Sequence, residues 1–91
     1  MTLRYVRHPN VRLTELEGEG VALHLDSRRY FTLNATGLLL AEALAQPRTM
    51  DELVAVLVAT FEVGGDEAAA TARPFVDRCV AAGLVVTTDA A

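Results

Sequence analysis

The spacing of apolar residues changes near Asn34, from an alternation typical of strands to a spacing typical of helices. In residues 11–16 and 21–25, apolar side chains alternate with polar or smaller ones, which predicts strands that each bury one face. Residues 30–33 are β-forming types and predict a third strand. A glycine-containing turn at 17–20 separates the first two strands, so a three-stranded antiparallel meander is the simplest arrangement.

Three helices are predicted after the strands. Asn34 can accept hydrogen bonds from the free N–H groups of the first helix, which ends by Gln46 because Pro47 disfavours helical geometry in the residue before it. Thr49 with Glu52 three places later forms a capping box at the start of the second helix. The predicted core stripe of this helix consists of Met50, Leu53, Val54, Leu57, Val58 and Phe61.

The third helix is predicted from a cap at Asp66 to about Ala82. Gly83 is a natural left-handed residue just after a helix. Pro74, inside the helix, should bend it because proline removes one backbone hydrogen bond. An apolar segment at 84–87 then predicts a short closing strand.

Strands followed by helices indicate an α+β fold, here a three-stranded antiparallel sheet followed by three helices, which is a winged helix-turn-helix-like arrangement. Val76 and Val80 are expected in its core. The chain has 91 residues, of which 52% are hydrophobic, and this is enough to bury one core. A single domain is therefore expected over residues 1–91, with its core at about 11–86.

The apolar segments and the cysteine content bear on the compartment. No apolar run approaches the roughly 20 residues of a transmembrane helix, and the N-terminus lacks the apolar centre of a signal peptide. Cys79 is the only cysteine, which allows no internal disulfide and fits a reducing compartment. A cytoplasmic protein without a membrane partner is expected.

The charge distribution argues against a nucleic-acid partner. The net charge is −4, and all eight basic residues are arginine. Residues 1–48 hold six arginines against five acids, whereas residues 49–91 hold two arginines against seven acids. A nucleic-acid-binding protein needs a basic surface to neutralise phosphates, and neither half of the chain supplies one.

No set of residues predicts catalysis. His24, Asp26 and Ser27 include the residue types of a hydrolytic triad, but they lie together on one hairpin with no recognisable oxyanion hole. An exposed hairpin end is the simpler interpretation. His8 precedes Pro9 in an extended arm, where we expect it to be solvated.

Metal and thiol chemistry are not predicted either. Two histidines and one cysteine, far apart in the sequence, form no zinc pattern. Cys79 lies near a helix C-terminus, where the helix dipole disfavours a thiolate. No glycine-rich phosphate-binding loop is recognisable in the sequence. We interpret four glycines as turn residues, namely Gly18, Gly20, Gly64 and Gly65. The chain is therefore predicted to be a non-enzyme without cofactor or metal.

An exposed strand edge offers a better candidate site. The third strand has free N–H and C=O groups along one side, and with the third helix it would form a groove where an extended peptide adds as a further strand. Gly37 costs about 0.5–1 kcal/mol relative to alanine in a helix, which suggests that another backbone passes closely there. The expected groove residues are Arg28, Arg29, Tyr30, Phe31, Thr32 and Leu33 from the strand and Phe75, Arg78, Cys79 and Ala82 from the helix.

Residues 30–37, Tyr-Phe-Thr-Leu-Asn-Ala-Thr-Gly, resemble the strand-to-helix signature of PqqD-like proteins. Residues 49–53 at the start of the second helix, and Phe75-Val76 leading to residues 82–85, fit the same family, and the resemblance spans about 11–86. These proteins are recognition elements of pathways that modify ribosomally synthesised peptides (RiPPs). The resemblance implies a winged-helix-like fold that binds the leader of a precursor peptide as an added strand. It also implies a leader contact at Val76.

Freestanding members of this size resemble the small leader-binding partner of split leader peptidases in lasso-peptide clusters. The implied partners are the precursor peptide, a cysteine-protease-type leader peptidase and the macrolactam-forming cyclase. Three alternatives stay open: a winged-helix DNA-binding regulator, a PqqD-type chaperone for a radical-SAM peptide-modifying enzyme, and an interaction domain that stabilises a protein partner without binding any leader.

Overall fold

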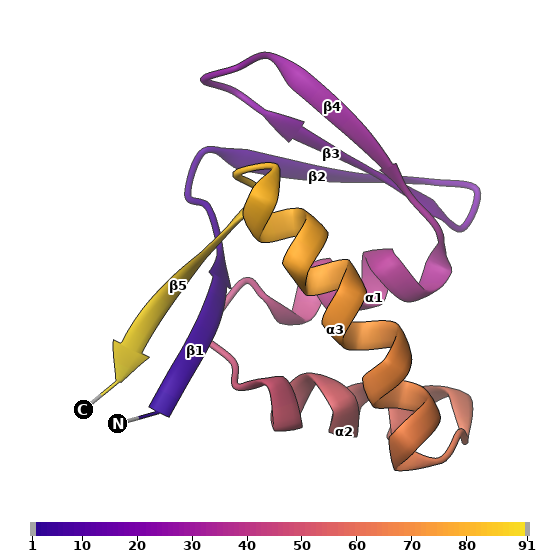
Figure 1. Ribbon diagram of the computed structural model, residues 1–91. Coiled ribbons are helices and arrows are strands. Elements are labelled where there is room, and N and C mark those ends of the chain that lie inside the picture. Colours follow the sequence, from indigo (N-terminus) through magenta and orange to yellow (C-terminus); the bar gives the residue numbers. More distant parts are fainter. Residues whose placement is uncertain (1, 91) are drawn as a thin grey trace.

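Helices and antiparallel strands are both present in a computed structural model that describes residues 2–90 (Figure 1). The elements in chain order are β1 (Thr2–Arg7), β2 (Val11–Leu16), β3 (Glu19–His24), β4 (Arg29–Leu33), α1 (Ala35–Ala43), α2 (Met50–Phe61), α3 (Gly65–Ala81) and β5 (Val85–Ala90). The predicted α+β class, with three helices after a three-stranded antiparallel sheet, is confirmed.

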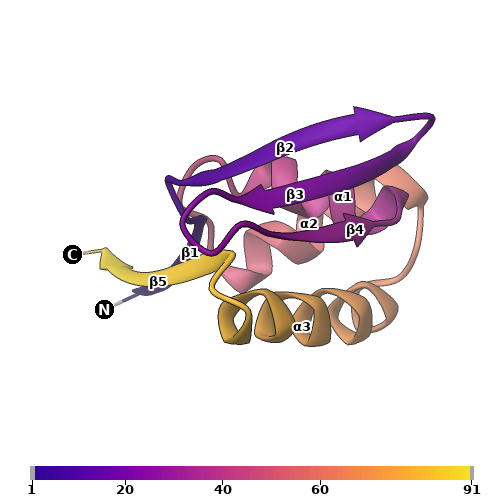
Figure 2. The same ribbon diagram turned by 90° about the horizontal axis from the view of Figure 1, so that it is seen from above.

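The three-stranded sheet has the order β2-β3-β4, as the predicted meander requires. Glu17 and Gly18 form the two-residue turn between β2 and β3, and both have positive φ, 56° and 83°, as in the hairpin turns that match strand twist. β4 is an outer strand of this sheet, and Figure 2 shows it as the strand of this sheet that lies nearest α3.

The buried face of β3 carries its smaller residues. Gly20, Ala22 and His24 are buried, while Leu23 is 37% exposed on the opposite face. Gly20 is therefore a strand residue and not the predicted turn residue. A Cβ built on Gly20 would lie 2.7 Å from Cδ1 of Leu38 in α1, so glycine is what allows α1 to lie this close to the sheet.

β1 is not among the predicted strands, because the sequence predicts only an extended arm before Pro9. β1 pairs antiparallel with β5 in a separate two-stranded sheet, from Arg7–Val85 to Thr2–Ala90. Tyr5 exchanges backbone hydrogen bonds with Arg48, of 2.7 and 2.8 Å, and its side chain is buried. The core thus reaches back before Val11, and the closing strand is longer than the predicted 84–87.

Most of the predicted helix caps are confirmed. Asn34 Oδ1 accepts a 2.8 Å hydrogen bond from the Gly37 N–H group, and Thr49 and Glu52 form both bonds of the capping box. Gly83 has a φ of 79° after α3, as predicted. The predicted cap at Asp66 is wrong, because Gly64 is the N-cap residue and Asp66 lies in the first turn of α3.

The core lies between the three-stranded sheet and the helices. Its largest fully buried side chains are Leu40, Leu44, Leu53, Leu57 and Val76. Three residues predicted for the core are instead substantially exposed, namely Val58 (37%), Phe61 (42%) and Val80 (37%). None of the helices in residues 2–90 is long and apolar enough to cross a bilayer.

Candidate peptide-binding groove

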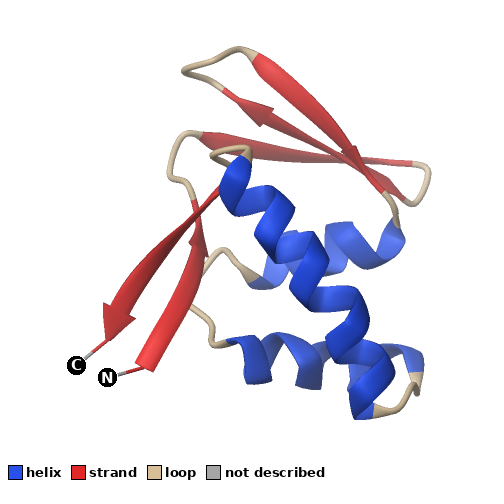
Figure 3. Ribbon diagram, in the orientation of Figure 1, coloured by secondary structure: helices blue, strands red, loops and turns tan. Residues whose placement is uncertain are grey.

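A groove of about 370 Å³ lies between β4 and α3. Figure 3 shows the course of the strands and helices around it, in the orientation of Figure 1. Strand, helix and the segment after the helix all contribute to it. Its lining consists of Phe31, Thr32, Leu33, Phe75, Arg78, Cys79, Ala82 and Leu84. Most of these side chains are apolar, and Arg78 is the charged one among them. The groove therefore suits an extended segment with apolar side chains.

β4 offers two kinds of contact to this groove. Phe31 and Leu33 point toward the helices, and Leu33 is buried whereas Phe31 is half-buried. Thr32 is exposed at the sheet edge. The Arg29 guanidinium lies 5.5 Å from the centre of the Phe31 ring, within the range of a cation–π contact. Because β4 is an outer strand, the backbone groups on its free side are available to a further strand.

Phe75 is the central aromatic residue on the helix side. A Cβ built on Gly37 would lie 3.0 Å from Cε1 of the Phe75 ring. The close neighbour expected at Gly37 is thus a side chain of α3, and the prediction of a passing backbone is wrong. Gly37 leaves space for Phe75, which is half-buried and can present the rest of its ring to an occupant.

Cys79 and Leu84 form the floor of the groove. Leu84 N–H donates a 2.9 Å hydrogen bond to Cys79 O, so the chain folds back over the end of α3 as its Gly83 predicts. Burial raises the pKa of the Cys79 thiol to about 11, although the nearby Arg78 partly opposes this shift. A reactive thiolate at neutral pH is therefore disfavoured, and Cys79 serves the groove as a small apolar residue.

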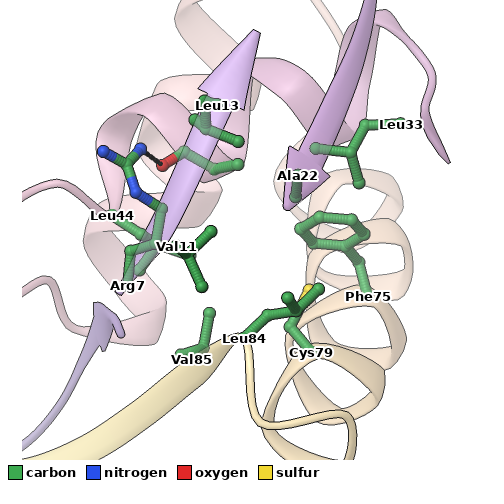
Figure 4. A pocket seen from close by; sticks show the side chains of 11 residues that line it. Arg7, Val11, Leu13, Ala22, Leu33, Leu44, Phe75, Cys79, Leu84 and Val85 are labelled. Atoms are coloured by element: carbon green, nitrogen blue, oxygen red, sulfur yellow. Dashed lines mark hydrogen bonds between the residues drawn. The ribbon is translucent and has the colours of Figure 1, made fainter. Parts of the chain in front are cut away.

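A small apolar cavity of about 10 Å³ lies behind this floor (Figure 4). Phe75, Leu33, Cys79 and Leu84 separate it from the groove, because they line both. Its volume is at the lower limit for one water molecule, and its walls are nearly all apolar, so it is expected to be dry. The floor thus has a little free space into which side chains can move when the groove is filled.

A smaller depression of about 120 Å³ extends the groove toward the start of α1. It shares Phe75 and Arg78 with the groove and adds Asn34, Thr36 and Thr71. A peptide following β4 would therefore meet the α1 N-terminus, where free N–H groups and the helix dipole favour negative charge.

The predicted site residues divide into two groups. Seven of them line the groove, namely Phe31, Thr32, Leu33, Phe75, Arg78, Cys79 and Ala82. Four do not line it: Arg28 sits in the β3–β4 turn with a φ of 59°, Arg29 stacks on Phe31, Tyr30 is 69% exposed, and Val76 is completely buried. Val76 therefore belongs to the core, as its position in the helix predicts, and its side chain is not accessible from the groove.

Leu84 is a groove residue that the sequence-based site omitted. Its signal was present, because an apolar residue just after a helix-ending glycine commonly packs back on the last turn. Leu84 is only 5% exposed, and it contributes both to the core and to the groove floor.

The surface charge of α2 and α3 does not suit DNA. Arg73 and Arg78 are their only basic residues, and the two helices also carry five acids. A recognition helix for nucleic acid needs basic side chains to contact phosphates, and these helices lack such a surface.

Residues 19–85 match the family described as coenzyme PQQ synthesis protein D (PqqD). This match covers most of the chain and includes β4, α1 and α3, the elements around the groove. The chain belongs to the PqqD family. Among proteins of curated function, none matches the chain.

Two solved structures share the fold. One is described as TbiB1 in complex with the TbiA(beta) leader peptide, with 24% identity, a TM-score of 0.78, and coverage of 88% of this chain and 93% of that one. The other is described as lasso peptide synthetase B1 complexed with the leader peptide, with 20% identity, a TM-score of 0.75, and coverage of 90% and 96%.

Proposed function

We propose that this protein binds, without catalysis, the leader segment of a ribosomally synthesised precursor peptide in lasso-peptide biosynthesis. The leader adds as a strand to the free edge of β4, beside α3. The observation that carries this proposal is the apolar groove between an unpaired strand edge and a helix, in a PqqD-family fold.

The dimensions of the site support binding of an extended peptide. β4 has five residues, so a paired strand would run for about 17 Å. Main-chain hydrogen bonds to β4 would give affinity, and side chains directed toward Phe75 and Leu84 would give selectivity. The two solved structures with the same fold are described as leader-peptide complexes, which supports the same class of ligand here.

The charges in the groove define the preferred leader. Arg78 is exposed and lines both the groove and its extension toward α1. A single cation beside apolar walls favours a leader that is neutral to acidic and partly apolar. With one main charged contact, leader affinity should depend only weakly on salt.

The proposal also assigns the protein a delivery role. The bound leader is presented to a cysteine-protease-type leader peptidase, and then the core peptide passes to a macrolactam-forming cyclase. The whole chain 1–91 acts as one recognition domain in the cytoplasm, with no cofactor of its own.

Titration of the protein with a fluorescently labelled leader, encoded by a precursor gene next to its own, tests leader binding. The expected result is a Kd in the micromolar range or tighter, with little change between low and physiological salt. A Kd weaker than about 100 µM, equal to a binding free energy of about −5.5 kcal/mol, contradicts the proposal.

A proline scan of Tyr30, Phe31 and Thr32 tests strand addition itself. Successive residues of β4 alternate in directing N–H toward β3 or toward the free edge. Proline at a position facing the free edge removes a donor without breaking the β3–β4 ladder. Variants that keep the wild-type melting temperature are therefore expected to lose leader affinity by roughly tenfold.

Thermal unfolding of each proline variant is the control, since it separates edge-facing positions from those that pair with β3. Unchanged leader affinity in every variant that remains folded would show that the leader binds without pairing to β4.

A further inference from the structure

Three metal-ligating side chains lie together outside the groove. His8 is in the turn between β1 and β2, His24 ends β3, and Asp26 is in the turn between β3 and β4. One ligand atom from each of the three lies within 4.8 Å of the other two, and the two imidazole rings are 4.7 Å apart between centroids. The separation of these residues in the sequence concealed this cluster, and His8, expected to be solvated, is half-buried beside His24.

We propose that His8, His24 and Asp26 form a binding site for a divalent transition-metal ion such as Zn²⁺. Two imidazoles and one carboxylate are the ligands that zinc accepts in three-ligand sites, with a fourth position for water. Zn–N bonds of about 2.0–2.1 Å place neighbouring ligand atoms about 3.3 Å apart. Closing the cluster therefore requires movements of about 1.5 Å, and the half-buried His8 and the exposed Asp26 can make them.

The surroundings hold the three ligands in place. His24 is buried, with 8% exposure, and acts as the fixed member. The Asn10 side-chain amide donates to both Asp26 carboxylate oxygens, at 3.1 and 3.0 Å. A hydrogen bond of this kind orients a ligating carboxylate while leaving lone pairs for the metal.

Metal binding would break one hydrogen bond at each imidazole ring. Nδ1 of His8 accepts the Asn10 N–H at 3.0 Å, and Nδ1 of His24 accepts the Asp26 N–H at 3.2 Å. Coordination at Nδ1 displaces that N–H group. Coordination at Nε2 moves the ring proton to Nδ1, with the same loss. Both N–H groups would then bind water, so micromolar affinity is expected, weaker than that of a dedicated structural zinc site.

A bound ion would join the β1–β2 turn to the β3–β4 turn. His8 N–H donates a 2.8 Å hydrogen bond to Leu84 O, which links this turn to the groove floor, and His24 is opposite Arg29, the first residue of β4. The ion would therefore fix the β1–β2 turn to the β3–β4 turn at the start of the peptide-binding strand.

Isothermal titration of untagged protein with Zn²⁺ tests the proposal. We expect one ion per chain, a Kd of micromolar order, and a melting temperature raised by about 10 °C at a zinc concentration a hundred times the Kd. His8→Gln and Asp26→Asn should each weaken binding at least tenfold. Both residues are at least partly exposed, so these variants are expected to fold.

Two control variants test the assignment of the ligands. Asp51→Asn, at an exposed acid on α2, and Cys79→Ala, at the only thiol, should bind zinc as the wild type does. No binding below about 100 µM zinc, or binding that survives His8→Gln and Asp26→Asn, or binding lost in Cys79→Ala, would overturn the proposal. Leader titration in EDTA measures the proposed peptide function separately, so failure of one proposal is distinguishable from failure of the other.

Discussion

α1 and α3 both lie beside the three-stranded sheet, but only α1 is packed tightly against it. α1 contacts β2, β3 and β4, whereas the main partners of α3 are α2 and β5. At the α1 side, Gly20 allows Leu38 to approach so closely that a methyl group would not fit. At the α3 side, the groove remains open beside β4. The groove exists because α3 is held by elements other than the sheet, so an occupant need not displace a packed interface.

Gly20→Ala should have the largest effect, a loss of stability at the tightly packed interface between α1 and the sheet. The added Cβ would lie 2.7 Å from Cδ1 and 3.2 Å from Cβ of the buried Leu38, and overpacking of this kind costs about 1–3 kcal/mol. The melting temperature should fall by about 5–15 °C. Gly65→Ala is the matched control, since nothing lies within 4 Å of its added Cβ. Equal melting temperatures for the two variants would show that the α1 contact is not tight.

Ala82→Trp should block the groove between β4 and α3. Ala82 lines the groove, so a large ring there would occupy the space of the leader and lower its affinity at least tenfold, about 1.4 kcal/mol. Ala81→Trp is the matched control because Ala81 is exposed and does not line the groove. Fluorescence titration of both variants checks the expectation. Equal loss of affinity in the two would place the leader elsewhere.

Gly37→Ala should affect binding more than stability. The added Cβ meets the Phe75 ring at 3.0 Å, but this half-buried ring can move toward the groove. Alanine also gains about 1 kcal/mol in helix propensity, so the free energy of unfolding should stay within about 1 kcal/mol of the wild type. Leader affinity should fall about threefold, or roughly 0.7 kcal/mol.

A double-mutant cycle with Phe75→Leu checks this mechanism. If the Phe75 ring transmits the effect, Gly37→Ala should not change leader affinity in the Phe75→Leu background. An undiminished effect in that background would exclude the ring as the cause.

The last expected effect is a loss of stability at alkaline pH, contributed by the buried Cys79 thiol. Its pKa is raised from 9.0 to about 11 by burial, so the folded state favours the protonated thiol. The corresponding stabilisation is complete below pH 9 and is lost as the pH rises from 9 to about 11. Melting temperatures of the wild type and Cys79→Ala, compared between pH 8 and 11, isolate this contribution. A constant difference across that range would contradict it.

The features that the sequence predicted well depend on neighbouring residues. The Asn34 cap, the Thr49–Glu52 capping box and the turn after Gly83 each involve residues within a few positions. The edge strand and the i, i+4 pair of Phe75 and Cys79 are also local patterns, and with the family resemblance they identified most of the groove. Local backbone geometry restricts such features strongly, so the residue types are informative.

The features that the sequence did not reveal depend on distant partners. β1 pairs with β5 at the other end of the chain, and short segments give little evidence of such a partner. The exposure of Leu23 and the burial of Ala22 follow from the approach of α1, which needs small side chains beneath it. The meeting of His8 with His24 likewise requires the turns of two different hairpins to be in place.

Pairing of β1 with β5 places the two ends of the fold side by side (Figure 1). A linker of a few residues could therefore join Ala90 to Thr2, and the chain could be reopened at the exposed Glu17–Gly18 turn. In that circular permutant the most distant strand pair along the chain becomes a local hairpin. β2 and β3 become the most distant strand pair in its place, so the contact order stays about the same and the permutant should fold at a rate similar to that of the natural chain order.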